Sequence, residues 1–258
     1  MPRKNLKNKP LVEAVLELRW VLAQQGPGLH FDPHYRLLLG RFSERINSDY
    51  PYHEPLPTSQ IPDGMVAHAV QHRFRHAQNE WPLVQIGPGI MTVNDTVKYT
   101  WSDFQKRCED AVGKLYDSHP VSAEFHVQDI VLRYIDAVPF DYTNDNIFTF
   151  LADKLKTRIS LPDSLFNNTD IQKNPELFNW QASFKHKKPS GMATLRFATG
   201  QKDAKPSLIW ETLIQSSGSD LPKFPDEFAK WLNDAHDITD DWFFKLIEGE
   251  LERRFSGD

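Results

Sequence analysis

Charged residues recur at alternate positions of one strand-like segment, and their types suit the binding of an anion or a metal ion. Within residues 11–20, LVEAVLELRW, the charged residues are Glu13, Glu17 and Arg19. Alternation with period two predicts a half-buried β-strand with these side chains on its polar face. Later strand-like segments contribute Arg133, Arg196 and Glu211. We expect the six side chains to meet across neighbouring strands and to form a ligand-binding set.

The chemistry of this set leaves two interpretations open. Arginine suits phosphate or carboxylate because its planar guanidinium group offers paired donors. Glutamates that alternate with a basic residue also resemble those of enzymes that hold triphosphates in a β-tunnel through glutamate-bound metal, although the spacing here is wider. The other interpretation is a ladder of cross-strand ion pairs on a solvated sheet face, which requires no ligand.

A basic cluster at two expected hairpin tips suits contact with phosphates. The lysines assigned to nucleic-acid binding are Lys185, Lys187, Lys188 and Lys202. Lysine and arginine side chains supply most of the sequence-independent affinity for nucleic acid, and the nearby rings of Trp180 and Phe184 allow bases to stack. Lysine-rich hairpin tips also serve solubility alone, so both interpretations stay open.

Histidines at four-residue spacing raise the question of a zinc site. His68, His72 and His76 share one side of an expected strand, but residues four apart in a strand are separated by about 13 Å, too far for one ion. The single cysteine, Cys108, has no second cysteine for a disulfide, which predicts an inert thiol in a reducing compartment. We predict no metal site and no cofactor.

Aromatic residues are concentrated near the C-terminus. Four of them are assigned to a partner interface: Trp242, Phe243, Phe244 and Phe255. This is more aromatic surface than one helix face buries, which favours a protein partner or a second copy of the chain, with core packing as the alternative. His236 lies beside Asp237 and Asp240, a grouping that suits a general base. We favour a structural histidine there and assign no catalytic residue.

The elements that position these residues follow from hydrophobic periodicity and turn signals. After the strand at residues 11–20, a Gly-Pro-Gly loop leads to Asp32 as the N-cap of a helix that ends by residue 50. The prolines of residues 51–64 predict an extended surface loop, and residues 65–77 predict a strand.

The stretch from Trp81 to Phe104 is the most informative of the chain. Two strand-like runs are joined by Pro88-Gly89, whose proline presets φ and whose glycine accepts a positive φ. A helix then begins near Trp101, with Thr100 or Ser102 as its cap. We therefore expect a hairpin that leads directly into a helix.

The second half repeats this order of elements. The expected elements are a strand at residues 125–140, a helix at 146–159, strands at 178–187, 191–199 and 207–216, and a helical region from Pro225 that is interrupted near residues 237–239. Both halves, residues 1–120 and 121–258, follow the order β, α, β, β, β, α. This predicts an α+β fold with mainly antiparallel sheet, helices on one face and an internal duplication of the TATA-binding-protein-like kind.

Composition narrows the functional class. The 258 residues contain 30 Lys and Arg against 35 Asp and Glu, a net charge of -5, which argues against a surface that is basic throughout. No apolar run approaches the roughly 20 residues of a membrane span, and the basic N-terminus lacks the apolar core of a signal peptide. We expect a cytoplasmic protein with no membrane partner.

Four segments spread over the chain carry a resemblance. They are KPLVEAVLELRW, WPLVQIGPGIMTVND with the following Tyr99 and Trp101, LRYID of Leu132 to Asp136, and the helix around His236. Together they resemble a sporadically distributed bacterial family of about this length and of uncharacterised function. The resemblance covers the full length, and it implies an association with mobile elements or antiviral defence.

From these observations we predict a non-enzymatic protein that binds a partner or ligand at its sheet face or C-terminal aromatic region. The sequence offers no pairing of a nucleophile with a base and no cofactor loop. One alternative is a nucleic-acid-binding protein that uses the open sheet and the basic tips. The other is a metal-dependent phosphohydrolase in the sheet groove.

Overall fold

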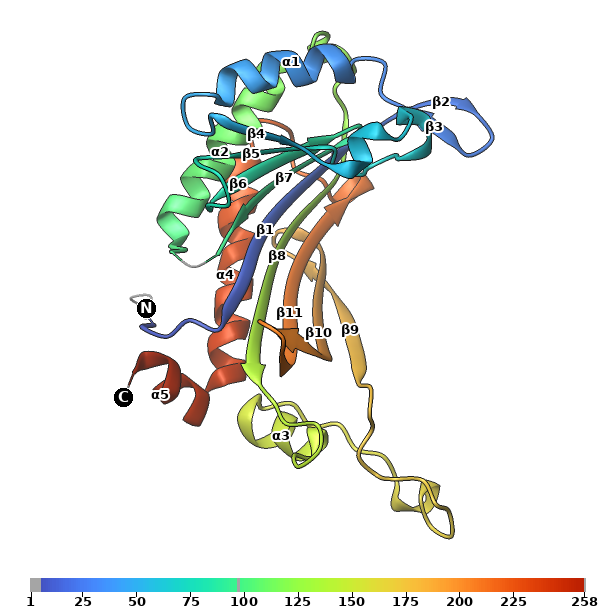
Figure 1. The fold of residues 1–258 in the computed structure, drawn as a ribbon, viewed down its shortest axis with the longest axis vertical. Helices are drawn as coiled ribbons and strands as arrows, with labels where there is room; N and C mark the ends of the chain where they lie inside the picture. The colour runs from blue at the N-terminus through green and yellow to red at the C-terminus, as the bar shows by residue number, and fades with distance from the viewer. Residues whose placement is uncertain (1–5, 97, 258) are drawn as a thin grey trace.

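The computed structural model describes residues 6–96 and 98–257, which form a mixed α+β fold around a nine-stranded antiparallel sheet (Figure 1). The strands in spatial order are β4 (Tyr52–Pro55), β5 (His72–Arg75), β6 (Leu83–Gly87), β7 (Ile90–Asp95), β1 (Leu11–Trp20), β8 (Val127–Pro139), β11 (Lys205–Ser217), β10 (Ser190–Lys202) and β9 (Asn179–Lys187). A small second sheet pairs β2 (Ala23–Gly26) with β3 (Leu29–Phe31). The helices are α1 (Tyr35–Ile46), α2 (Trp101–Ser118), α3 (Ile147–Lys154), α4 (Phe228–Ile247) and α5 (Glu250–Ser256).

The two halves of the chain meet at the centre of this sheet. Strands β1 and β8 pair in antiparallel register, with Leu16 opposite Leu132 and Leu18 opposite Ile130. In each half the first strand lies beside the last strand, which gives the orders β4-β5-β6-β7-β1 and β8-β11-β10-β9. The predicted fold class is confirmed, and the sheet is continuous across the two halves. An internal duplication stays a prediction because no repeat of residues accompanies this order.

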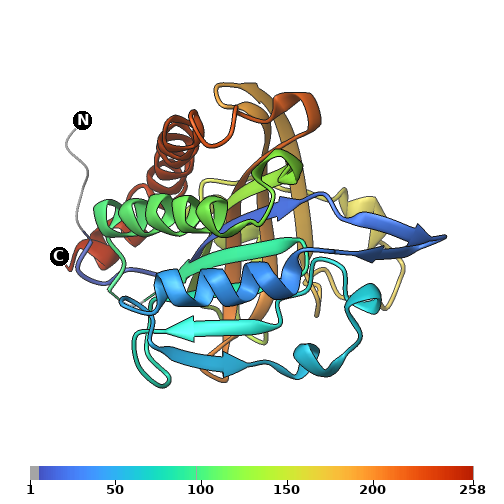
Figure 2. The same ribbon diagram turned by 90° about the horizontal axis from the view of Figure 1, so that it is seen from above.

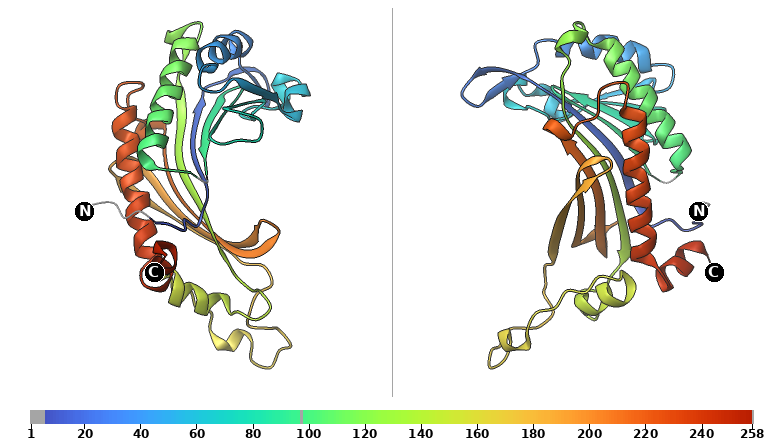
Figure 3. Two further views of the ribbon diagram at one scale, coloured as in Figure 1. Left: turned by 60° about the vertical axis from the view of Figure 1, so that its left-hand side comes forward. Right: turned by 180° about the vertical axis from the view of Figure 1, so that it is seen from behind.

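The two faces of the sheet differ in burial. In β1 the side chains of Leu16, Leu18 and Trp20 are buried, whereas the intervening Glu17 and Arg19 are half-exposed. Helices α1, α2 and α4 lie over the buried face (Figures 2 and 3). We call this the helix face and the opposite one the open face. The period-two alternation of the sequence thus separates an apolar core from a polar surface.

Two buried clusters fill the space between the sheet and its helices. One lies under α1, α2 and the first part of α4, and it contains the fully buried Cys108. The other joins α3, the end of α4 and α5 to the long strands β8, β10 and β11. Burial raises the pKa of the Cys108 thiol, because the charged thiolate is poorly solvated there.

The stretch at residues 81–104 forms the expected hairpin and helix start. Gly89 takes a positive φ of 76° in the turn between β6 and β7. Thr100 is the N-cap of α2, and its side chain accepts a hydrogen bond from the Asp103 backbone nitrogen. These predictions are confirmed because turn and cap chemistry act within a few residues of the chain.

The start of α1 differs from the prediction. The helix begins at Tyr35 with His34 as its N-cap. The predicted cap, Asp32, lies two residues earlier, and its carboxylate makes two hydrogen bonds. Its Oδ2 accepts from Trp20 Nε1 at 2.8 Å, and its Oδ1 accepts from the His34 backbone nitrogen at 2.9 Å. The Gly-Pro-Gly loop before it is the turn of the β2–β3 hairpin.

Two further predictions in the first half are wrong. Residues 51–64 contain the edge strand β4 and short 3₁₀ turns instead of an extended loop, and the strand expected at 65–77 is limited to β5. His68 takes a positive φ of 56°, which ends extended backbone before β5 begins. An edge strand tolerates proline because the backbone positions on its outer side donate no hydrogen bond to a neighbouring strand.

The helices of the second half also differ from their predicted limits. The expected interruption at residues 237–239 is absent from α4, which is continuous from Phe228 to Ile247. Thr239 is buried there, and its hydroxyl donates to the His236 carbonyl oxygen, so it does not break the helix. Helix α3 ends at Lys154, before Lys156 with its positive φ. In the described part of the chain, no helix has the length and apolar character that crossing a membrane requires.

Candidate functional site

A pocket of about 390 Å³ lies on the helix face, where α2 begins between the sheet and α4. Its polar lining comprises Lys9, Thr100, Ser102, Tyr134, Asp136, Thr212, His236, Thr239 and Asp240. Its aromatic and aliphatic lining comprises Leu6, Pro10, Leu11, Tyr99, Trp101, Phe243 and Phe244. We call it the Asp136 pocket. It brings together segments that are more than a hundred residues apart in sequence.

Strand β8 directs two polar side chains into this pocket. Tyr134 and Asp136 are in phase with Leu132, which faces the helices, so their side chains point to the same face. Successive side chains on one face of a strand are about 7 Å apart. The strand therefore presents a phenol and a carboxyl group side by side beneath α4.

Three polar side chains form a hydrogen-bonded chain along one wall. The hydroxyl oxygens of Tyr99 and Tyr134 are 2.8 Å apart, and Tyr134 Oη is 2.9 Å from His236 Nδ1. The ring of Trp101 stacks on the His236 imidazole, with the ring centroids 3.6 Å apart. Burial holds the pKa of Tyr134 well above its usual value. The chain and the stacked ring give this wall a defined geometry.

Asp136 places a buried carboxyl group at the pocket. The residue is 3% exposed, and none of the described residues donates a hydrogen bond to its carboxyl group. Burial raises its pKa to about 8, and the charge of Lys202 opposes this rise. At neutral pH the carboxyl is therefore mostly protonated, with one O–H to donate and one carbonyl oxygen to accept.

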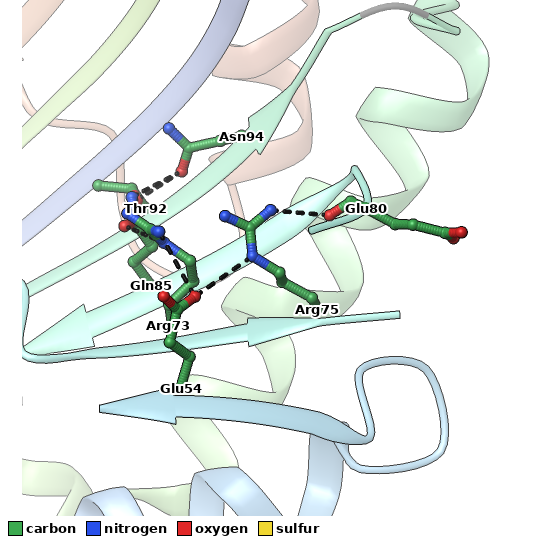
Figure 4. A network of polar contacts seen from close by, with 7 residues as sticks. All are labelled: Glu54, Arg73, Arg75, Glu80, Gln85, Thr92 and Asn94. Atoms are coloured by element: carbon green, nitrogen blue, oxygen red, sulfur yellow. Dashed lines mark hydrogen bonds and ion pairs between the residues drawn. The ribbon is translucent and has the colours of Figure 1, made fainter. Parts of the chain in front are cut away.

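The opposite, open face carries a fully connected network of polar side chains (Figure 4). Arg73 Nε donates to Gln85 Oε1 at 3.0 Å, and Gln85 Nε2 donates to Thr92 Oγ1 at 3.2 Å. Thr92 Oγ1 donates to Asn94 Oδ1 at 2.6 Å, and Asn94 Nδ2 donates to Glu13 Oε1 at 2.7 Å. We call these five residues, with Glu54 paired to Arg73 at 3.5 Å, the polar ladder. It crosses the five strands from β4 to β1.

The six residues predicted to bind a ligand all lie on this open face, in separate groups. Glu17 and Arg19 form an ion pair of 2.7 Å along β1. Across β8, β11 and β10, Glu211 lies 4.0 Å from Arg133 and 2.9 Å from Arg196. Glu13 ends the polar ladder. Ion pairing therefore explains their placement, and binding of a ligand by them stays a prediction.

The lysines predicted to bind nucleic acid do not form one patch. Lys185, Lys187 and Lys188 surround the β9–β10 turn, whereas Lys202 lies at the β10–β11 turn. Thirteen residues of β10 separate these turns, a distance of roughly 40 Å at the rise of a β-strand. Lys188 is 3.9 Å from Asp234, and Lys202 Nζ donates to the Pro10 carbonyl oxygen.

The aromatic residues predicted to form a partner interface make contacts within the chain. Phe243 and Phe244 line the Asp136 pocket, Trp242 lies edge-on to Phe184, and Phe255 is buried in α5. Helix α4 contacts the strands β8 and β11 and the helices α2 and α5. Four of the large exposed apolar side chains of the second half lie in the segment between α3 and β9: Leu161, Leu165, Ile171 and Leu177.

The three spaced histidines are held in unrelated positions. His72 Nδ1 lies 3.0 Å from His53 Nε2, and His68 contacts the Trp20 carbonyl oxygen at 3.2 Å. His76 lies beyond β5, 3.4 Å from the Asp49 carbonyl oxygen. Within residues 6–96 and 98–257, no group of three or more His, Cys, Asp and Glu side chains is arranged to hold a metal ion.

The Asp136 pocket is the site that sequence reasoning did not find. A signal was present, because Asp136 stands in phase with the apolar residues of its strand rather than with the charged ones. A carboxylic acid on the buried side of a strand is rare unless it is paired. All four segments that carry the family resemblance also line the pocket, through Lys9 to Leu11, through Tyr99 and Trp101, through Tyr134 and Asp136, and through His236.

Fold and pocket together define an α+β protein with a pocket of mixed polar and aromatic lining between its sheet and two helices. No protein-family model matches the sequence, and a search of curated proteins finds no match. The resemblance drawn from the four segments, and the accessory role in mobile elements or antiviral defence that it implies, stay predictions.

Proposed function

We propose that the protein binds a small organic ligand in the Asp136 pocket. The observation that supports this is a carboxyl group, 3% exposed, that lines a pocket and receives no hydrogen bond from the described residues. A buried polar group without a partner costs about 1–3 kcal/mol. A ligand that exchanges hydrogen bonds with Asp136 recovers this free energy, so the site favours an occupant with polar atoms.

The dimensions and walls of the pocket suit such a ligand. Its volume of about 390 Å³ lies in the range of about 300–1,000 Å³ found for small-molecule sites. Trp101, Tyr99 and Phe244 provide flat apolar surfaces, and the hydrogen-bonded chain from Tyr99 to His236 keeps one wall in place. A few convergent polar groups in an otherwise apolar pocket are typical of sites that orient one class of molecule.

Binding is tested by a thermal-shift screen of the purified protein against a library of small metabolites. We expect at least one compound to raise the melting temperature of the wild type, since binding to the folded state stabilises it. Asp136→Ala should lose this rise. Asp129→Asn is the matched control, because this carboxylate lies on the open face and accepts from Gln215 at 2.9 Å. No shift with any compound, or an equal shift in Asp136→Ala, contradicts the proposal.

A further inference from the structure

A second pocket adjoins the Asp136 pocket and has the opposite electrostatic character. Its volume is about 430 Å³, and it shares Lys9 and Pro10 with the first pocket. Its charged lining comprises Lys9, Lys202, Lys205, Arg254 and Asp203. Four cationic side chains and one carboxylate therefore line this pocket, although the net charge of the protein is -5. We call it the Lys202 pocket.

Four segments from distant parts of the sequence line this pocket, at residues 8–10, 137–139, 202–207 and 254–255, and hydrogen bonds hold them together. The Asn8 backbone nitrogen donates to the Phe255 carbonyl oxygen at 2.8 Å, which ties the chain before β1 to α5. Lys202 Nζ donates to the Pro10 carbonyl oxygen at 3.4 Å, which ties the β10–β11 turn to the same segment. The cations are thus gathered by the tertiary structure and not by a run in the sequence.

The two pockets are linked electrostatically as well as spatially. Lys202 belongs to the second pocket, yet its charge acts on Asp136 in the first pocket and lowers the pKa that burial raises. Lys9 lines both pockets, and its Nζ donates to the Tyr99 carbonyl oxygen at 2.5 Å. A single ligand that occupied both pockets would contact aromatic walls at one end and cations at the other.

We infer that the ligand has two parts, an aromatic ring held in the Asp136 pocket and a phosphate group held in the Lys202 pocket, as in a nucleoside phosphate. The inference rests on the proposed function and adds the chemical class of the ligand. Aromatic side chains stack on any nucleobase, and a protonated carboxyl offers a donor beside an acceptor to the edge of a ring. Lysine and arginine side chains bind phosphate through charge-assisted hydrogen bonds.

The probes that test this are the common ribonucleosides and their 5′-monophosphates, titrated against the full chain by isothermal titration calorimetry. We expect at least one monophosphate to bind about tenfold or more tightly than its nucleoside, because a hydrogen bond to a charged group contributes about one factor of ten or more. The double variant Lys202→Gln/Lys205→Gln should lose this difference. Arg254→Gln, on a separate element, should reduce it independently.

The charge-matched control is Lys230→Gln/Lys245→Gln, two exposed lysines of α4 that form ion pairs with Asp234 and Asp241 on the same helix. We expect this control to keep the full difference between nucleotide and nucleoside. Circular dichroism and melting temperature confirm that each variant is folded before titration.

Three results would overturn the inference in distinguishable ways. The first is equal affinity for nucleoside and monophosphate, or a difference in affinity that persists in both the double variant and Arg254→Gln. This result would show that the Lys202 pocket does not bind the phosphate, and it would not contradict small-molecule binding in the Asp136 pocket. Failure of every nucleoside and nucleotide, with another compound active in the thermal-shift screen, rejects the ligand class alone. Failure of the whole screen rejects the proposed function as well.

Discussion

The polar ladder on the open face and the Asp136 pocket on the helix face use similar side chains to opposite effect. In the ladder, Glu54 to Glu13 form an unbroken series of hydrogen bonds and an ion pair, in which the buried Thr92 and Asn94 also have partners. In the pocket, Asp136 is buried and receives no hydrogen bond from the described residues. The two regions lie on opposite faces of the same sheet.

The comparison teaches that charge and spacing alone do not identify a site. Satisfied polar groups on a half-exposed sheet contribute to register and solubility, and such pairs add little stability. A buried polar group without a partner is costly, and in a native protein it calls for an explanation such as a ligand. The predictions below test this contrast, from the largest expected effect to the smallest.

The largest effect is expected from Asp136→Asn, on the pH dependence of the free energy of unfolding. The folded-state pKa of about 8 lies above the ordinary value of 3.8, so between these values the folded protein retains a proton that the unfolded chain loses. The free energy of unfolding of the wild type therefore falls as pH rises from 4 to 8, by an amount on the order of 5 kcal/mol. Asp136→Asn should remove this part of the fall.

Urea unfolding of wild type and variant at a series of pH values measures this difference. Asp129→Asn is the control, since it removes a carboxylate of the open face and leaves Asp136 intact. A wild-type stability that does not depend on Asp136 between pH 5 and 8 would show that the carboxyl is better solvated or paired than the structure indicates.

The next effect is expected from Tyr134→Phe. The change removes the hydroxyl group that joins Tyr99 to His236 and leaves both of these partners with one hydrogen bond fewer. We expect a loss of about 2 kcal/mol in the free energy of unfolding, together with weaker ligand binding. Tyr116→Phe is the matched control, because its hydroxyl makes one long bond of 3.4 Å to the Phe224 carbonyl oxygen. Equal losses in the two variants would mean that the hydrogen-bonded chain has no special role.

A smaller effect is expected from Asn94→Ala in the polar ladder. The side chain is 5% exposed and bonds to Thr92 and Glu13, but the Thr92 hydroxyl keeps a partner because Gln85 also donates to it. We therefore expect the free energy of unfolding to fall by about 1 kcal/mol. The rise in melting temperature caused by the ligand of the Asp136 pocket should be unchanged. Loss of ligand binding in this variant, measured by the same thermal shift, would indicate that the ligand binds at the open face instead.

The smallest effect is expected from replacing Lys185, Lys187 and Lys188 with glutamine. These side chains are exposed, and surface substitutions of this kind change stability by less than about 0.5 kcal/mol. Ligand affinity in the two adjoining pockets should also be unchanged, because the triplet lies at the far end of β10. A drop in salt-dependent nucleic-acid binding, measured by fluorescence anisotropy, would instead support the alternative function predicted for these lysines.

Much of the fold could be predicted from local patterns. The alternation in residues 11–20, the Pro88-Gly89 turn and the Thr100 cap each act over a few residues, so the elements they specify formed where expected. The errors arose where a distant partner competed with a local preference. The Asp32 carboxylate is shared between the Trp20 indole and the His34 backbone, and α1 begins only at Tyr35. The segment β4 became a strand because β5 lies beside it.

The sequence by itself determined which residue types each face of the sheet would carry, since the side-chain period of a strand is two. Only the tertiary structure decided which of them became a candidate site. Asp136 lies in β8, His236 in α4 and Lys202 in β10, far apart along the chain. Their proximity follows from the pairing of β1 with β8 and from the packing of α4 on both halves. Burial without a partner is a property of that packing, and no spacing along the chain encodes it.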